Sequence, residues 1–428
     1  MKAIWILLML AATAQGESYT LEQAVAAALA GSPDAKKAEA RMASSVALLM
    51  QAHAAFQPKV ALESSYLRTN QPVSVFGFAL NQQSFSPGLD FNNVPDADNW
   101  NNRVLMTMPI YSGGANSARK DAAEAGLAAS GHSAVAIRQM VAYEVARTWL
   151  MVRRTQSLRE AALAAKSAYA TNADLARKRE KAGTALRADV LDVEVRLAQA
   201  EEDAAQVGNA NALARHALRN LMGLEEGEVD IAKGGAGLKR PAPGTLPKRP
   251  ELLAALENER AVEAGLRGAK AGWKPQVNAF GSLEHNRGSV FEENGGNYTV
   301  GVMAQWTLWD GRQTRGRVRE AEAQLTAARE ETRKLRLGID LEVRQAELGV
   351  KDAEERLAVT RRTIELAEES VKLTRDRFEQ GLTLATQLID AETALTAARV
   401  RRVEAETKLS LALAAWRRAL GLDVVGGE

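Results

Sequence analysis

Cysteine is absent from the 428-residue chain, which excludes disulfides, thiolate metal sites and a cysteine nucleophile. Aromatic residues make up only 5% of the chain, which is little for one compact core. Lys and Arg number 55 against 53 Asp and Glu, so the net charge is only +2, and no block of basic residues occurs. A nucleic-acid partner is therefore not expected.

Motifs of catalysis and cofactor binding are also missing. The sequence contains no G-x-S-x-G, P-loop or H-E-x-x-H pattern. The four histidines are isolated and do not have the spacing of a metal site: His53, His132, His216 and His285. We therefore expect neither an enzyme nor a bound cofactor.

Apolar runs long enough to cross a bilayer as a helix are absent as well. The uncharged stretch Ala3–Leu10 follows Lys2 and precedes the A-x-A pattern of Ala12–Ala14. This arrangement predicts a secretory signal peptide over residues 1–16. A membrane anchor is disfavoured because the run is too short to span a bilayer and Glu17 follows soon after it.

What the chain does have is a long internal repeat. The segment Lys181–Glu194 reappears as Gln380–Glu392, and Ile110–Gly113 has its counterpart in Leu308–Gly311 at a matching spacing. Such a repeat indicates two copies of one structural module. The predicted organisation is a first repeat, a Gly- and Pro-rich linker, a second repeat and a tail: residues 17–224, 225–249, 250–422 and 423–428.

Each copy carries a pair of predicted strands. The clearest is the last, in which Tyr298, Val300 and Val302 alternate with polar or small residues. A long polar loop is expected over residues 70–102, between the first two strands. The four predicted strands are Val60–Leu67, Arg103–Ile110, Val277–Leu283 and Tyr298–Trp309.

Long helices fill most of the remainder. Thr20–Phe56 is a predicted helix with Thr20 as N-cap, Gln23 in capping-box position and a break near Ser32 caused by Pro33. The proline-free tract Gln313–Glu379 predicts a helix about 100 Å long.

Two apolar rows follow this long tract at heptad spacing and face nearly opposite ways, which suits a helix with a neighbour on each side, as in the wall of a tube. A helix inside an ordinary bundle is the alternative, which the length disfavours. The rows are Val343, Val350, Leu357, Ile364, Val371 and Phe378, and Val359, Leu366 and Leu373.

Four short strands cannot satisfy their own edges. Three chains with four strands each would close a barrel of 12 strands, an even number within the range of outer-membrane barrels. The alternative is a small sheet packed on the helices, with its aromatic side chains in a core. The residues alone leave both possibilities open.

Taken together, these elements resemble the outer-membrane efflux (TolC) family, the trimeric channel-tunnels of Gram-negative bacteria. The resemblance covers about residues 18–422 and rests on the order, duplication and spacing of short motifs. These are Thr20–Ala24, Pro58 and Pro275 before the first strand of each pair, the Ile110–Gly113 and Leu308–Gly311 turns, Gly183 and Gly381, and Leu388–Glu392.

The resemblance implies a mainly α fold with a small transmembrane β part. Three chains would form a 12-stranded outer-membrane barrel, continued by a long α-helical barrel in the periplasm. The helical turns would lie at the periplasmic tip, where a periplasmic adaptor protein docks in this family. The implied adaptor contacts are Gly183, Thr184, Gly381, Leu382 and Thr383.

The family also closes its tunnel near the tip with inward-pointing carboxylates. Asp390 matches one such position, whereas Gln387 stands where the family has a second acid. The resemblance therefore implies a gate at Gln387 and Asp390 that blocks cations less strongly than a double ring of acids would.

The predicted function is the outer-membrane channel-tunnel of a tripartite efflux or type I secretion system. It would be a homotrimer in contact with outer-membrane lipid, and an inner-membrane pump would drive transport through it by way of the adaptor. The alternative is a soluble periplasmic coiled-coil scaffold or adaptor protein. That alternative does not explain two strand pairs at matched positions of the repeat.

Overall fold

The computed structural model describes residues 17–88, 90, 92–232, 234, 236–242 and 244–425. The predicted signal peptide lies outside these residues. The chain divides into two compact units, and each unit takes segments from both repeats. Unit 1 comprises Met1–Arg41, His132–Leu253 and Lys334–Glu428, and unit 2 comprises Met42–Gly131 and Ala254–Arg333.

The sheet of unit 2 has four antiparallel strands in the order β2-β3-β5-β6. Their bounds are Lys59–Thr69, Ala97–Tyr111, Gln276–Arg287 and Asn294–Gln305. The two strand pairs, one from each repeat, join between β3 and β5, where Val104 lies opposite Leu283. The predicted pairs are therefore confirmed, and they form one continuous sheet.

The fourth strand was predicted to reach Trp309, but β6 ends at Gln305. Gln305 pairs with Gln276, and Pro275, which precedes Gln276, has no N–H to continue the ladder. Beyond β6, the indole nitrogen of Trp306 donates to the carbonyl of Trp273 instead.

Part of the expected polar loop is helical. Helix α3 spans Pro72–Asn81, begins with a proline in its first turn and buries Val75 and Ala79. Proline is well placed there because the first helical N–H groups have no intrahelical acceptor. The prediction of a polar loop over residues 70–102 was wrong for this stretch, and also for residues 97–102, which belong to β3.

The linker also contains a strand that the sequence did not reveal. β4 (Val229–Ile231) pairs in parallel with β1 (Glu17–Tyr19), so residues 225–249 are not irregular throughout. The first predicted helix is divided as expected into α1 (Leu21–Gly31) and α2 (Pro33–Ala54). Its capping box is also confirmed. The backbone amide of Gln23 donates to the Thr20 hydroxyl, and the backbone amide of Thr20 donates to the side-chain oxygen of Gln23.

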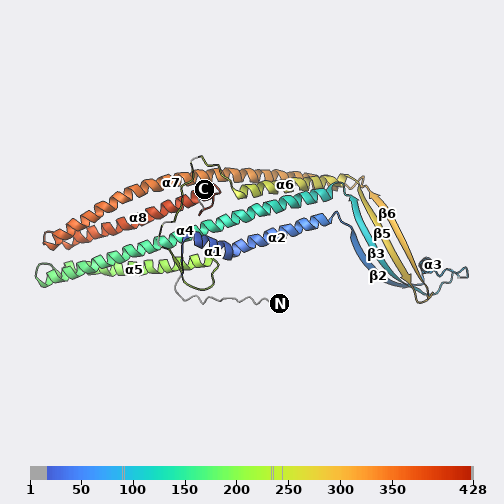
Figure 1. Cartoon of the computed structure of the whole chain (residues 1–428), viewed down its shortest axis with the longest axis horizontal. Coiled ribbons are helices and arrows are strands. Elements are labelled where there is room, and N and C mark those ends of the chain that lie inside the picture. The colour runs from blue at the N-terminus through green and yellow to red at the C-terminus, as the bar shows by residue number, and fades with distance from the viewer. Residues whose placement is uncertain are drawn as a thin grey trace, which may run out of the picture. The chain divides into compact units, whose positions relative to one another are not determined.

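Each repeat forms a long helical hairpin (Figure 1). The first consists of α4 (Ala115–Lys181) and α5 (Arg187–Leu221), and the second of α7 (Gln313–Glu379) and α8 (Ala385–Ala419). The helix α6 (Pro250–Lys270) precedes β5. Among the described residues, no helix has the length and apolar composition needed to cross a membrane.

The first heptad row of α7 packs against α8, with Val350 beside Trp416 and Ile364 beside Leu395. A larger core surrounds Trp149 of α4, whose indole donates to the carbonyl of Tyr19 and so fastens the N-terminal strand to the hairpin. The second heptad row stays exposed in the single chain, at 66% for Val359 and 64% for Leu366.

Candidate functional site at the hairpin tips and on the sheet

The tips of both hairpins have the same turn chemistry. Gly183 and Gly381 adopt left-handed backbone conformations, with φ of 73° and 78°. The amide of Leu382 donates to the carbonyl of Arg377, and the amide of Thr184 donates to that of Arg179. This is the Schellman arrangement, which requires glycine at the left-handed position.

Arg179 holds the two tips together. Its guanidinium donates to the carbonyl of Phe378 at 2.8 Å and to that of Thr184 at 3.2 Å, and it lies 4.7 Å from the centre of the Phe378 ring. The prediction missed this residue. Arg377 occupies the equivalent place in the second repeat, but only the packing of the two hairpins brings Arg179 beside Phe378.

A pocket of about 350 Å³ lies between the joined tips and brings together five of the predicted site residues: Thr184, Gly381, Leu382, Thr383 and Gln387. Arg179 and Phe378 also line it. Gly183 is exposed on the neighbouring turn. The tips are thus one surface to which both repeats contribute.

Gln387 and Asp390 share the exposed face of α8, and Leu388 and Ile389 between them are buried. The buried pair contributes to a small core with Phe378. The Thr383 hydroxyl donates to the Gln387 side chain. Because α8 is packed through its other face, both predicted gate residues keep their side chains available to the surroundings.

One ion pair recurs in both hairpins. Arg177 contacts Glu194 at 2.9 Å, and Arg375 contacts Glu392 at 2.5 Å, at equivalent positions of the two repeats. The hydrogen bond with Glu194 raises the pKa of Arg177. Each pair links a long helix to its return helix. This feature, too, was visible in the repeat but was not predicted.

The strand register assigns a different character to each face of the sheet. One face is apolar and exposed: Val60, Leu62, Tyr66, Trp100, Val104, Met106, Met108, Leu283, Tyr298, Val300 and Val302. The other carries mainly polar groups: Glu63, Asn101, Arg103, Thr107, Ser282, Glu284, Asn286 and Thr299. On that polar face, Arg103 lies between Glu284 at 3.3 Å and Glu63 at 3.9 Å.

An uncovered apolar face beside a polar one is the pattern of a strand set that meets lipid on one side and water on the other. Aromatic side chains stand at both ends of the sheet, with Tyr66 and Trp100 in edge-to-face contact at one end and Tyr111, Trp306 and Trp309 exposed near the other. Such belts are typical of membrane–water interfaces.

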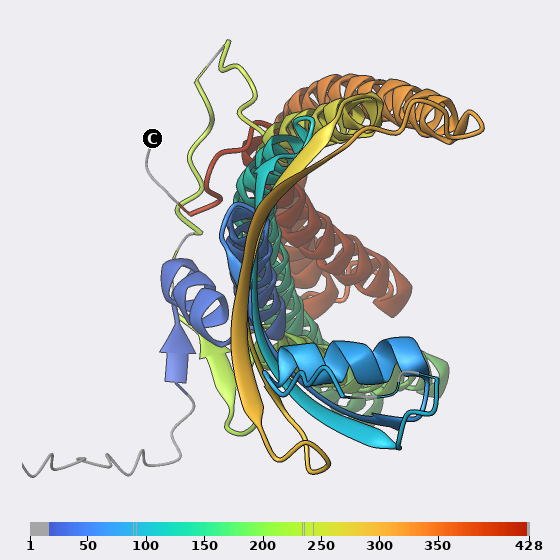
Figure 2. The same cartoon turned by 90° about the vertical axis from the view of Figure 1, so that its right-hand side faces the viewer.

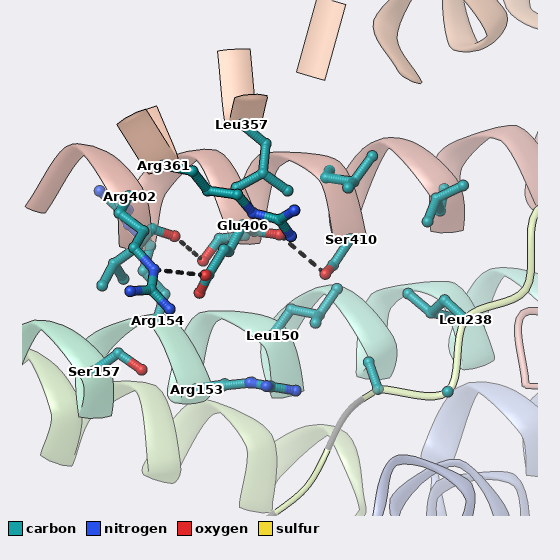
Figure 3. Close-up of a pocket in the computed structure, with 16 residues that line it drawn as sticks. Leu150, Arg153, Arg154, Ser157, Leu238, Leu357, Arg361, Arg402, Glu406 and Ser410 are labelled. Carbon is teal, nitrogen blue, oxygen red and sulfur yellow. Dashed lines mark hydrogen bonds and ion pairs between the residues drawn. The ribbon is translucent and has the colours of Figure 1, made fainter. Parts of the chain in front are cut away.

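A cavity of about 560 Å³ lies beside the linker, between α4, α7 and α8 (Figure 3). Leucines form its apolar wall, and Arg402 donates to Glu406 at 2.9 Å. Four arginines line it: Arg153, Arg154, Arg361 and Arg402. It contains none of the predicted site residues. The described residues include no group of three or more potential metal-ligating side chains.

Comparisons with known proteins agree with this geometry. The family model described as outer membrane efflux protein matches residues 24–224 and 244–422. The fusaric acid resistance protein FusA of Burkholderia cepacia is 26% identical over 320 residues, which are 71% of this chain and 58% of that protein. The match therefore spans less than two thirds of the length of that relative.

Solved structures show the same fold. The outer membrane protein VceC of Vibrio cholerae superimposes with a TM-score of 0.80 at 20% identity, over 94% of this chain and 96% of the other. The CmeC outer membrane channel of Campylobacter jejuni gives a TM-score of 0.81 at 15% identity, over 95% and 87% of the two chains.

The predicted fold class is thereby confirmed: a mainly α chain of two structural repeats, with a small transmembrane β part of four strands and long helices that extend into the periplasm. The chain belongs to the outer membrane efflux protein family.

Proposed function

We propose that this protein is the outer-membrane exit duct of a tripartite efflux machine. The observation that carries the proposal is the two-faced sheet, apolar on one face and polar on the other, built from both repeats. A polar face turned inward lines a water-filled bore, while the apolar face meets the hydrocarbon of the outer membrane.

Assembly from three chains is supported by the strand edges and the apolar row that one chain leaves uncovered. Within the described residues, β2 and β6 each have one edge without a partner strand. The second heptad row of α7 is uncovered as well, with Leu373 54% exposed. Three copies would pair these edges into a 12-stranded barrel and cover each apolar row with a neighbouring helix.

The tip surface is our proposed contact for a periplasmic adaptor. Gly183, Thr184, Gly381, Leu382 and Thr383 lie on the two turns that Arg179 connects. Leu382 is 72% exposed and offers an apolar anchor at the end of the second hairpin. An adaptor that docks here would touch both repeats at once and could shift one hairpin against the other.

Gln387 and Asp390 form the proposed periplasmic gate. In a threefold assembly Asp390 would contribute one ring of three carboxylates, and Gln387 would contribute a neutral ring one helical turn away. Replacing Asp390 with Ala should raise the conductance of the closed channel in planar bilayers. Replacing Asp192, its counterpart in the first repeat, with Ala is the control. Equal conductance of wild type and Asp390→Ala would remove Asp390 from the gate.

The duct itself is passive in this proposal. An inner-membrane pump supplies the energy, and this chain contributes neither catalysis nor a cofactor. The name of the Burkholderia cepacia relative, a fusaric acid resistance protein, supports small organic molecules as cargo.

Fractionation and electron microscopy test the proposal. We expect the protein in the outer-membrane fraction, as threefold hollow particles after detergent extraction. The competing function, a soluble periplasmic scaffold, leaves the exposed apolar face of the sheet unexplained. Release by osmotic shock as solid rods would favour that scaffold and overturn the duct.

A further inference from the structure

Helix α3 lies inside the curve of the sheet (Figure 2), and the residue that follows it, Gln82, contacts the polar face. The amide of the fully buried Gln82 side chain donates to the carbonyl of Asp98 at 2.8 Å and to the side chain of Asn99 at 3.0 Å. Asn99 in turn donates to Asn286. Asn99 and Asn286 both belong to the polar face. Asn99 stands two residues before Asn101 on β3, and Asn286 lies opposite Asn101 and accepts from it.

The second repeat fixes the same end of α3. A side chain at Gly295 would collide with the carbonyl of Asn81, and one at Gly288 would come within 2.5 Å of the carbonyl of Asp98. The Asp98 carboxylate accepts from the amide and hydroxyl of Ser289, both at 2.9 Å, and so holds the β5–β6 turn against this junction. The hydrogen bonds of Gln82 and the two close glycine contacts hold this end of α3 against the sheet.

The two faces of α3 are both apolar but differ in surroundings. Val75 and Ala79 are fully buried toward the sheet. Val73, Phe76 and Leu80 lie on the opposite face and are 77%, 39% and 48% exposed. Phe85 packs edge-to-face on Phe76 at 6.0 Å and extends this surface. A helix tied down on one side thus presents apolar groups on the side that faces away from the sheet.

We propose that α3 is a fixed apolar constriction inside the outer mouth of the channel. This inference rests on the proposed function, since the polar face borders a bore only if the sheet closes into a barrel. Cargo that leaves the duct passes the surface of Val73, Phe76, Leu80 and Phe85. That surface limits the size of what passes, and it favours apolar or aromatic molecules over strongly hydrated ones.

Size-graded thiol labelling tests the constriction without depending on the periplasmic gate. The chain has no cysteine, so Thr299→Cys, on the exposed polar face of β6, provides a single probe. Intact cells are treated from outside with maleimides attached to polyethylene glycol of increasing size. We expect a lower size limit for labelling with α3 intact than in a variant whose residues 73–83 are replaced by a short Gly-Ser linker.

Two adjacent glycines supply a matched pair of point variants. Gly295→Ala should displace α3 and raise the size limit, whereas a side chain at Gly296 meets only the carbonyl of Glu284 at 3.7 Å, so Gly296→Ala should behave as wild type. Trimer recovery on native gels checks that each variant assembles.

An unchanged size limit in the linker variant would overturn the constriction while leaving the duct intact. Complete lack of labelling by even the smallest maleimide in every variant, with the protein present in the outer membrane, would instead contradict the open bore on which the proposed function depends.

Discussion

At the scale of single residues, the ion pair that occurs in both repeats allows a direct comparison, because its two glutamates differ in burial. The Glu392 side chain is 5% exposed and contacts Arg375, whereas its counterpart Glu194 is 31% exposed and contacts Arg177. Glu392 is buried, so its hydrogen bond to the charged Arg375 is shielded from water, and Glu392→Ala should lower the free energy of unfolding by about 1–3 kcal/mol. Glu194→Ala should cost at most about 1 kcal/mol.

Chemical unfolding in detergent, followed by helical circular dichroism, measures both losses. Arg375 is 39% exposed, so water can reach it once Glu392 is gone, which limits the larger loss. Equal losses in the two variants would mean that burial of Glu392 does not set the strength of its pair.

Residue roles were only partly accessible from the sequence. The turn glycines at Gly183 and Gly381 were predictable because a left-handed position follows from local chemistry. Arg179 was not identified, although it contacts both tips. Its role depends on Phe378, which lies far away in sequence and is brought near only by packing of the two hairpins.

At the scale of elements, one arginine joins the end of the linker to three helices. Arg249, only 5% exposed, contacts Glu251 of α6 at 3.0 Å, Glu342 of α7 at 2.7 Å and the carbonyl of Ala419 of α8 at 3.4 Å. Burial alone would raise the pKa of Glu251. The hydrogen bonds from Arg249, the bond from the Glu251 backbone amide and the positive charges of Arg249 and Arg418 together outweigh burial and hold the pKa below its ordinary value of 4.5.

This junction predicts a dependence of stability on pH. A carboxylate with a lowered pKa stabilises the fold above its unfolded pKa, and this contribution is lost as the pH falls through the folded pKa. Wild type should therefore lose more thermal stability than Glu251→Gln between pH 7 and acid below 4.5. Melting curves of both proteins across that range make the comparison. Parallel losses would show that the junction does not respond to acid.

Elements were predictable where one pattern ran long and failed where a short segment depended on a distant partner. The bounds of α7 match the proline-free tract Gln313–Glu379, because heptad spacing over many turns leaves little choice. The three-residue strands β1 and β4 depend on their pairing with each other. Helix α3 is short, and its stability comes from Gln82 and the sheet beneath it.

At the scale of the whole molecule, unpaired strand edges and a second heptad row pointed to neighbouring chains, and the resemblance to the family implied a trimer. Val359, Leu366 and Leu373 are exposed in the single chain, as a row that packs against a neighbouring subunit requires. The sequence of this chain does not identify the adaptor or the pump, because that identity depends on the surface of another protein.

A substitution in this exposed row therefore tests assembly without disturbing the fold of the single chain. Leu366 is 64% exposed, so Leu366→Glu costs little within one subunit. Covering such a side chain in an assembly is worth about 1.5–3 kcal/mol, and a buried glutamate adds a desolvation penalty. Because the substitution recurs in every subunit, we expect a marked loss of trimers by light scattering, with helical content retained.

Leu246→Glu, at a 79% exposed linker position, introduces the same charge away from the row and should leave assembly unchanged. Trimers of Leu366→Glu as abundant as those of the Leu246 control would show that this face of α7 does not meet a neighbouring subunit.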